Sequence, residues 1–167
     1  DNKIVRLLLD RAKINPKRVV FAEADQLDVL KAAQIVYEEG IAKPILLGRK
    51  ETIEALMAEI EFDANIPIVD PKTEQENPRK NKYAKVYWEQ RKRRGVTYYS
   101  AQRLMRERNY FAAMMVNEGD ADALISGYSR NYPTVVKPML ELIGMAKGAT
   151  RVATTNLMMT KRGPMFL

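Results

Sequence analysis

Apolar residues along the chain follow two alternating patterns, short continuous runs and longer segments with a period near 3.6 residues. Residues 18–22 form a run rich in β-branched and aromatic side chains, which predicts a buried strand. Residues 29–37 then carry apolar side chains at helical spacing, and Gly40 predicts the end of that helix. The alternation continues with a strand at 43–48, a helix around 53–60 and a short strand at 66–69. Such alternation predicts βαβ units and a parallel sheet.

The second half of the chain is predicted to be richer in helices. Residues 70–82 contain two prolines and few apolar side chains, so we interpret them as a loop. A helix at 83–94 is expected to stop at Gly95, and Thr97 and Asn109 are predicted N-caps of the next two helices. The rest of the pattern predicts a strand at 121–126, a loop at 127–131, a helix at 132–143, a strand at 151–160, a tight turn at 161–163 and a strand from 164. A short opening helix before Pro16 completes the prediction.

Composition limits the available chemistry. The chain of 167 residues is 46% hydrophobic and 29% charged, which is typical of a soluble globular protein. It has no cysteine and no histidine, which excludes disulfides, zinc–thiolate sites and the commonest general base. No apolar run approaches the roughly 18 residues that cross a bilayer, and the first ten residues lack the layout of a signal peptide. We therefore expect a cytoplasmic protein with no membrane partner.

The net charge of +7 raises the question of an acidic partner. The basic residues gather at 79–82 and 91–94, around one predicted helix. They are not interleaved with stacking aromatic residues, so we expect no nucleic-acid partner. Two interpretations remain open, a solvated helix face and a pocket for a phosphorylated small molecule.

Candidate ligand groups follow three of the predicted strands, because open α/β sheets bind ligands outside the carboxyl ends of their strands. Glu23 and Asp25 follow the first strand, where carboxylates serve as metal or ribose ligands or, more often, as caps and turns. Residues 126–130 (SGYSR) follow a later strand and combine hydroxyls, a permissive glycine and Arg130, which has the geometry to clamp a phosphate. An ordinary Ser-Gly turn is the alternative. Residues 154–156 place polar side chains within an apolar strand, which costs stability unless these side chains are paired or useful. A buried, hydrogen-bonded strand is the more frequent outcome.

The run at the end of the chain, Met165-Phe166-Leu167, is apolar and has no turn, cap or polar tail after it. We expect that the sequence is part of a longer one. The chain has no GxGxxG motif, no P-loop and no metal-spaced cluster, so nothing in it directly indicates nucleotide-dependent chemistry.

Blocks of the sequence, in order, resemble phosphate acetyltransferases and butyryltransferases. The blocks are residues 18–25, 40–48, 68–71, 91–97, 110–115 and 118–127. The resemblance implies an α/β fold, a three-layer sandwich with a mainly parallel sheet, in a two-lobed domain similar to isocitrate and isopropylmalate dehydrogenases. It also implies that residues 1–145 form the N-terminal lobe and that residues 146–167 begin a truncated second lobe, with the active site in the cleft between the lobes.

Two kinds of protein carry such a domain. One is the free-standing enzyme, which exchanges acetyl groups between coenzyme A and phosphate. The other is the large NADP-dependent malic enzyme of bacteria, whose C-terminal part resembles the transferase and binds acetyl-CoA as a regulator. Residues 92–97 and 161–167 resemble the malic-enzyme version, and residues 127–133 replace the small Ser-rich loop of the active enzymes. Lys137 stands where those enzymes have a substrate-binding arginine, and lysine lacks its planar two-pronged grip.

The resemblance therefore implies an acetyl-CoA-binding regulatory and oligomerisation domain of a malic enzyme, with an authentic phosphate acetyltransferase as the alternative. Arg91 matches the family's other N-terminal ligand arginine. The residues expected to bind acyl-CoA or phosphate are Arg91, Ser126, Gly127, Arg130 and Lys137. No catalytic residue or metal ligand is expected here, because the family's aspartate base and oxyanion-stabilising groups lie beyond Leu167.

The implied partners are acetyl-CoA or a related acyl-CoA and further copies of the chain. This segment is expected to need no cofactor. NADP and a divalent metal, Mg or Mn, are expected in an upstream malic-enzyme domain of the parent.

Overall fold

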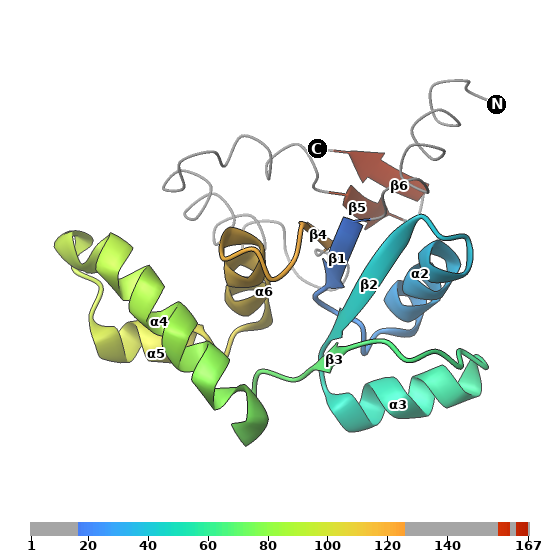
Figure 1. Ribbon diagram of the computed structural model, residues 1–167, viewed down its shortest axis with the longest axis horizontal. Helices are drawn as coiled ribbons and strands as arrows, with labels where there is room; N and C mark the ends of the chain where they lie inside the picture. The colour runs from blue at the N-terminus through green and yellow to red at the C-terminus, as the bar shows by residue number, and fades with distance from the viewer. Residues whose placement is uncertain (1–16, 126–156, 161–162, 167) are drawn as a thin grey trace.

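The computed structural model describes residues 17–125, 157–160 and 163–166 (Figure 1). Within them, four strands form a parallel sheet in the order β3–β2–β1–β4. The strands are β1 (Lys17–Phe21), β2 (Ala42–Leu47), β3 (Ile68–Val69) and β4 (Ala123–Ile125). Each coincides with an apolar run of the sequence, so the predicted parallel sheet of βαβ units is confirmed.

Side chains of the central strand β1 alternate between the two faces of the sheet. Val20 lies opposite Ile45 of β2 and Leu124 of β4, and its side chain joins one hydrophobic cluster. The neighbouring Phe21 joins a second cluster on the other face. Both residues are almost fully buried. The period of two along the strand therefore makes one short segment serve two cores.

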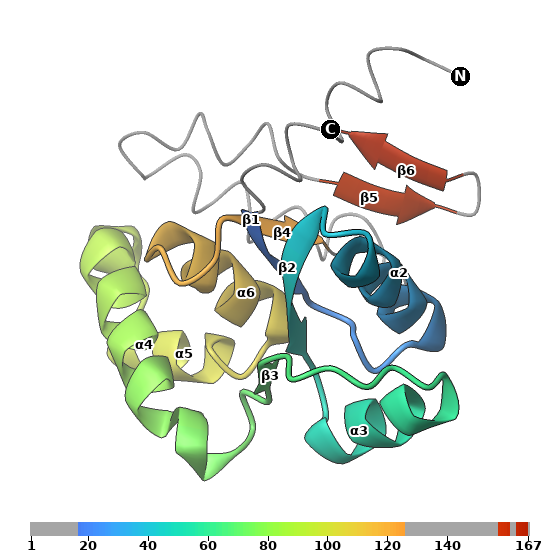
Figure 2. The ribbon, with the colours of Figure 1, turned by 45° about the vertical axis from the view of Figure 1, so that its right-hand side comes forward.

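Helices cover both faces of the sheet (Figure 2). The helices α2 (Leu27–Glu38) and α3 (Lys50–Glu59) pack against the cluster that contains Phe21. The helices α4 (Asn77–Arg91), α5 (Tyr98–Leu104) and α6 (Arg108–Asn117) pack against the cluster that contains Val20. The fold is thus a three-layer α/β sandwich, as the family resemblance implies.

The order of the strands defines a switch point in the sheet. From β1 the chain moves outward through α2 to β2 and through α3 to β3. It then crosses back over the opposite face through α4, α5 and α6 and adds β4 on the far side of β1. The connections reverse direction between β1 and β4, and ligands of open α/β sheets bind at such a point, at the carboxyl ends of the strands.

The loop predicted at residues 70–82 is wrong for most of its length. A 3₁₀ turn occupies Glu74–Glu76, and α4 begins at Asn77, six residues before the predicted start. Proline is tolerated in the first helical turn, where Pro78 lies, because its missing N–H has no partner there in any case. An ion pair between Arg79 and Glu76 at 3.2 Å also supports this turn. The first turns of α4 face solvent, so apolar periodicity could not reveal them.

The end of α4 and the start of α5 agree with the sequence. Lys92–Arg94 form a 3₁₀ turn after α4, and Gly95 stops it with a φ of +89° in the left-handed region. Thr97 is the N-cap of α5, and it forms a capping box in which the Ser100 amide donates to Thr97 Oγ1 at 3.1 Å. The predicted cap at Asn109 is wrong, because α6 starts at Arg108 after the N-cap Glu107. Asn109 is buried within the first turn instead of bounding it.

A separate antiparallel pair joins β5 (Leu157–Thr160) and β6 (Gly163–Phe166). The two strands confirm the predicted strands at this position over their described residues, and Thr160 lies opposite Gly163. Residues 161–162 of the predicted turn lie outside the described residues. The predicted opening helix, the loop at 127–131, the helix at 132–143 and residues 151–156 lie outside the described residues. The division at residue 145 stays a prediction. In the part of the chain that the structure describes, no helix is long and apolar enough to span a membrane.

Candidate ligand site at the carboxyl edge of the sheet

Polar residues gather where the parallel strands end. Glu23 and Asp25 lie in the turn after β1, Gly48 follows β2, and Asp70 follows β3. Parallel strands all end at one edge of the sheet, so these residues share that edge. Arg108, the first residue of α6, reaches the same edge from the opposite helical layer.

Arg108 and Asp25 form a two-pronged ion pair. Arg108 Nη1 donates to Asp25 Oδ1 at 2.6 Å, and Nη2 donates to Oδ2 at 2.5 Å. The side chains are 25% and 12% exposed, so the pair is largely shielded from water. Parallel N–H···O bonds of this kind are strong and fix geometry. The pair therefore ties the start of α6 to the turn after β1.

The electrostatics of this edge explain why a cation can begin α6. The pKa of Arg108 is raised above its usual value, chiefly by the hydrogen bond to Asp25; burial opposes the shift, while the charges of Asp25, Glu23 and Asp70 add to it. A cation in the first turn of a helix faces the positive end of the helix dipole, which is unfavourable. The surrounding carboxylates outweigh that cost. Sequence reasoning missed Arg108; its one visible signal is a basic residue at the start of a helix whose first turn has no acidic residue.

Gly48 allows the end of β2 to approach Asp25 closely. Its φ is +154°, and a Cβ at this position would lie 3.2 Å from Asp25 Cγ and 3.3 Å from Ile53 Cδ1. Both distances are shorter than most Cβ contacts, so the neighbouring side chains would have to shift by a few tenths of an ångström. The glycine therefore keeps the Asp25 carboxylate where Arg108 can grip it.

The carboxylates of this edge serve largely as turn and pairing groups. Asp70 Oδ1 accepts a hydrogen bond from the Lys72 amide at 3.0 Å, and the Asp70 carbonyl accepts one from Thr73 Oγ1 at 2.8 Å. Such a local turn is typical of aspartate. Among the described residues no three carboxylates are grouped closely enough to hold a metal ion. Of the two roles open to Glu23 and Asp25 on sequence, the geometry of Asp25 favours the structural one.

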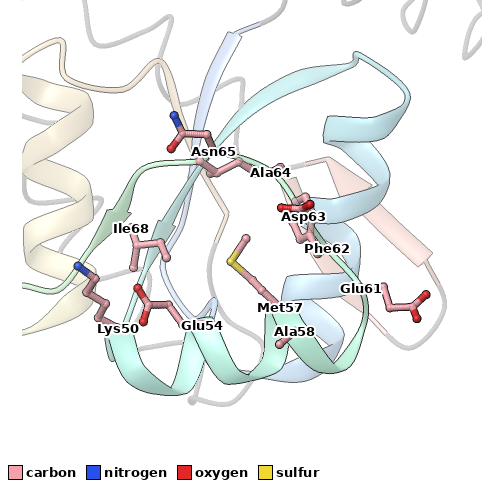
Figure 3. Close-up of a pocket in the computed structure, with 11 residues that line it drawn as sticks. Lys50, Glu54, Met57, Ala58, Glu61, Phe62, Asp63, Ala64, Asn65 and Ile68 are labelled. Atoms are coloured by element: carbon pink, nitrogen blue, oxygen red, sulfur yellow. The ribbon is translucent and has the colours of Figure 1, made fainter.

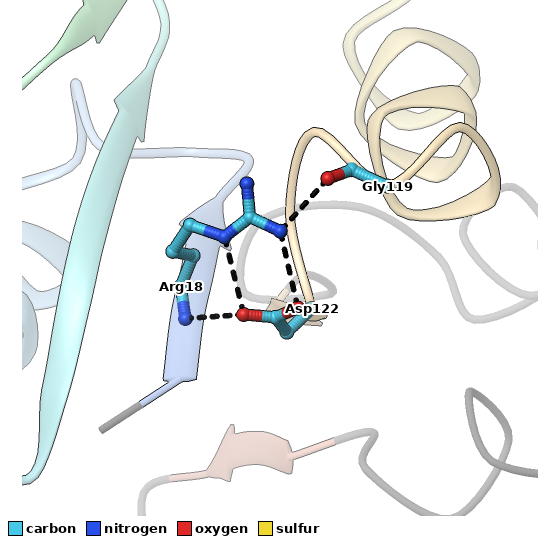
Figure 4. Close-up of polar contacts among 3 residues, drawn as sticks. All are labelled: Arg18, Gly119 and Asp122. Carbon is cyan, nitrogen blue, oxygen red and sulfur yellow. Dashed lines mark hydrogen bonds and ion pairs between the residues drawn. The ribbon is translucent and has the colours of Figure 1, made fainter. Parts of the chain in front are cut away.

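The amino edge of the sheet carries a second arginine–aspartate contact, which fixes β4 against β1 (Figure 4). The Arg18 amide and Nε both donate to Asp122 Oδ2, at 2.9 Å and 3.2 Å, and Arg18 Nη2 donates to the Gly119 carbonyl at 2.8 Å. Because of the hydrogen bond from Arg18, the pKa of Asp122 lies below its usual value. At the other end of β4, the Ile125 carbonyl accepts from the Ala22 amide at 3.0 Å. Both ends of this short strand are thus held at the switch point.

Arg91 is the one predicted ligand residue that lies within the described part of the chain. It is the last residue of α4, is 8% exposed and already takes part in an interaction within the fold. The axis of α4 is about 20 Å long, so Arg91 lies far from the first turn of that helix. Ser126, Gly127, Arg130 and Lys137 lie outside the described residues, and their roles stay predictions. The grouping of these five residues as one site therefore stays a prediction.

A pocket of about 610 Å³ lies between α3 and the segment that leads into β3 (Figure 3). Its apolar lining includes Met57, Phe62 and Ile68, and its charged lining is mostly acidic, with Glu54, Glu61 and Asp63 against the single amine of Lys50. Three carboxylates repel a phosphate group. This pocket is therefore a poor candidate for an acyl-CoA or acyl-phosphate ligand.

The fold first defines the class of protein: an open α/β sandwich whose connections reverse direction between β1 and β4. The family described as phosphate acetyl/butaryl transferase matches residues 3–167. The chain belongs to this family.

Its relatives include enzymes of two kinds. The phosphate acetyltransferase of Thermoanaerobacterium thermosaccharolyticum is 33% identical over 93% of this chain and 46% of its own length. The NADP-dependent malic enzyme of Salmonella typhimurium is 32% identical over 99% of this chain and 22% of its own length. In the solved structure of the EutD phosphotransacetylase from Staphylococcus aureus, the fold matches with a TM-score of 0.72 and 28% identity, over 84% of this chain and 42% of that one. The chain thus spans less than half the length of each.

Proposed function

We propose that this chain is the first part of a phosphotransacetylase-like domain that binds acetyl-CoA and regulates a malic enzyme. The two kinds of relative are almost equally similar, at 33% and 32% identity, so overall likeness does not choose between them. The observation that carries the choice is Lys137, which stands where the active transferases have a substrate-binding arginine. Lysine keeps the charge but cannot grip a tetrahedral oxyanion or phosphate with two parallel hydrogen bonds.

The described half of the site supports a binding role. Arg108 is held by Asp25, and Arg91 is buried and engaged within the fold. The Arg108 guanidinium is therefore not poised to receive charge that develops in a transition state, as oxyanion-stabilising groups must be. In this proposal Arg108 holds the frame, and Arg91 with the chain from Ser126 to Lys137 supplies the ligand contacts.

The expected cofactors, self-association and cellular location concern the full-length parent protein. NADP and a divalent metal would serve the malic-enzyme domain, and acetyl-CoA bound to the present domain would change the rate of malate oxidation. Self-association through this domain would carry that effect between subunits. A cytoplasmic location fits such a metabolic enzyme.

The alternative is an authentic phosphate acetyltransferase. It is favoured by the likeness in fold and sequence to the EutD phosphotransacetylase over 84% of this chain. The two functions differ in one reaction, the transfer of the acetyl group from coenzyme A to phosphate, which releases the free thiol.

The test measures three quantities in the full-length parent: acetyl-CoA binding by calorimetry, phosphate-dependent thiol release, and NADP-linked malate oxidation with and without acetyl-CoA. We expect binding, a changed oxidation rate and no thiol release. Lys137→Ala should weaken acetyl-CoA binding at least tenfold, while Lys137→Arg should retain it. Thiol release that Arg91→Ala abolishes, in a variant whose circular dichroism shows a native fold, would establish the transferase instead.

A further inference from the structure

A second concave site lies between the first turns of α4 and the end of α5. It is a groove of about 240 Å³, and three cations line it: Lys80 from α4, Arg103 from α5 and Arg106 from the turn after α5. Three side-chain amides also line it: Asn77, Asn81 and Gln102. No carboxylate is among its lining residues. The proposed acetyl-CoA contacts involve none of these residues.

The cations of this groove lack the partners that their neighbours have. Arg79 pairs with Glu76 at 3.2 Å, and Lys92 pairs with Glu89 at 2.8 Å. Among the described residues, Lys80, Arg103 and Arg106 make no ion pair. Like charges that converge on one hollow repel each other, and a bound anion relieves that repulsion.

The start of α4 adds to the positive field. Asn77 is the first residue of this 15-residue helix, and the first turn has no acidic side chain. The N-cap residue Glu76 is paired with Arg79 at 3.2 Å. The N-terminal end of a helix carries a partial positive charge and N–H groups that favour phosphate. The cations, the amide donors and the helix N-terminus therefore all favour a bound anion.

Tyr99 gives the groove an aromatic wall. Its side chain is 70% exposed, and the Arg103 guanidinium lies 5.9 Å from the centre of its ring. An exposed ring beside cations is suited to stacking against a planar base. The groove is smaller than the roughly 300–1,000 Å³ of pockets for whole drug-sized ligands, so it has room for phosphates with the rest of the ligand lying over the ring.

We propose that the α4–α5 groove binds the diphosphate of a nucleotide, with the base against Tyr99. Arg103 and Arg106 are suited to grip phosphate oxygens in pairs, and Lys80 adds a point charge. The diphosphate can come from a free nucleotide or from the adenosine diphosphate portion of coenzyme A. Its chemistry is the same in both cases.

The test titrates ADP, pyrophosphate and acetyl-CoA into the full-length parent by calorimetry at fixed ionic strength. We expect ADP and pyrophosphate to bind, and Lys80→Ala with Arg103→Ala to weaken both at least tenfold. The matched control is Lys82→Ala with Arg94→Ala, which removes the same charge from exposed positions outside the groove. Lys82 lies about 200° around α4 from Lys80, on the opposite side of the helix. The control should change affinity less than twofold.

The titration with acetyl-CoA distinguishes a free nucleotide from the nucleotide portion of coenzyme A as the source of the diphosphate. If the groove variant weakens ADP but not acetyl-CoA, the groove takes a free nucleotide; if it weakens both, the groove holds the nucleotide end of coenzyme A. Either result supports the proposal, and neither depends on whether acetyl-CoA regulates or reacts. Tyr99→Ala should weaken ADP at least threefold and leave pyrophosphate unchanged. Equal losses in the groove and control variants, or no binding of ADP and pyrophosphate, would overturn the proposal.

Discussion

Arg108 occupies a position where the helix dipole disfavours a cation, and the Asp25 carboxylate reverses that preference. The Asp25 side chain is 12% exposed and both of its oxygens accept hydrogen bonds from Arg108. Glu23 and Asp70 add their negative charges from neighbouring turns. If the guanidinium were removed, a shielded carboxylate would remain beside other carboxylates, a costly arrangement.

Replacement of Arg108 tests the value of this pair. Arg108→Ala should lower the free energy of unfolding by about 2 kcal/mol, because charge-assisted, partly buried hydrogen bonds are worth more than neutral ones. The unfolding free energy of Arg108→Lys should lie between those of the native chain and Arg108→Ala, since lysine keeps the charge but cannot form two parallel hydrogen bonds. Urea denaturation measures both. Arg106→Ala, an exposed arginine two residues earlier, is the control and should change stability by less than about 0.5 kcal/mol. Equal effects of the two alanine variants would contradict the assigned role.

Asp122 leads to a prediction about pH. Its folded-state pKa lies below the unfolded value of about 3.9, so its pairing stabilises the fold above that pH and is lost as pH falls through the folded pKa. The side chains of Arg18 and Asp122 are 46% and 38% exposed, so screening limits the gain to less than about 1 kcal/mol. The difference in unfolding free energy between the native chain and Asp122→Asn should shrink from pH 7 to pH 3. A constant difference would contradict this account.

Residue-scale features divide into those that sequence could reveal and those that it could not. Thr97 was visible as a cap because the signal lies within four residues of chain. The pairing of Arg108 with Asp25 joins residues 83 positions apart, so only the folded arrangement brings them together. Gly48 is similar, since its closeness to Asp25 comes from the pairing of β1 with β2. Local chemistry was predictable, and contacts between distant turns were not.

Helix ends show the same division at the scale of elements. Strands and helices with an apolar face were predicted within a few residues, because burial selects their side chains. The first turns of α4 carry mostly polar residues, and a helix and a loop look alike there in a pattern of hydrophobicity. Asn109 looked like a cap by residue type, yet it is buried within the first turn of α6. Tertiary packing decided these two boundaries.

The caps of α5 and α3 offer a matched pair of substitutions. Thr97→Ala should lower the free energy of unfolding by about 1 kcal/mol, because it leaves the Ser100 amide without its partner, while Thr97→Ser should retain most of the stability. The N-cap of α3, Arg49, makes no side-chain cap and has an extended backbone, so Arg49→Ser should raise stability by about 0.5 kcal/mol. Thermal or urea unfolding measures all three. A loss in Thr97→Ser equal to that in Thr97→Ala would show that the hydroxyl is not the stabilising group.

At the scale of the whole molecule, the described core consists of two hydrophobic clusters on opposite faces of one sheet. Val20 and Phe21 are adjacent in β1, yet they belong to different clusters, and the same holds for Leu46 and Leu47 in β2. If such a strand loses its packing on one face, we expect it to shift and to lose packing on the other face as well. The carboxyl edge depends on this coupling, because Asp25 comes from one layer's turn and Arg108 from the other layer's helix.

Trp88 allows the coupling of the layers to be measured, since it is the single tryptophan of the chain and packs against the cluster that contains Val20. Leu46→Ala removes a fully buried side chain from the opposite cluster and should cost about 2–5 kcal/mol. If the sheet couples the layers, Trp88 fluorescence and far-ultraviolet circular dichroism should shift to the same lower urea midpoint. Ile35→Ala, at a position that is 55% exposed, is the control and should leave both midpoints almost unchanged. A fluorescence midpoint that stays fixed while the dichroism midpoint falls would show that the layers unfold separately. The pair of Arg108 and Asp25 would then bridge two independent units and could not hold the carboxyl edge of the sheet rigid.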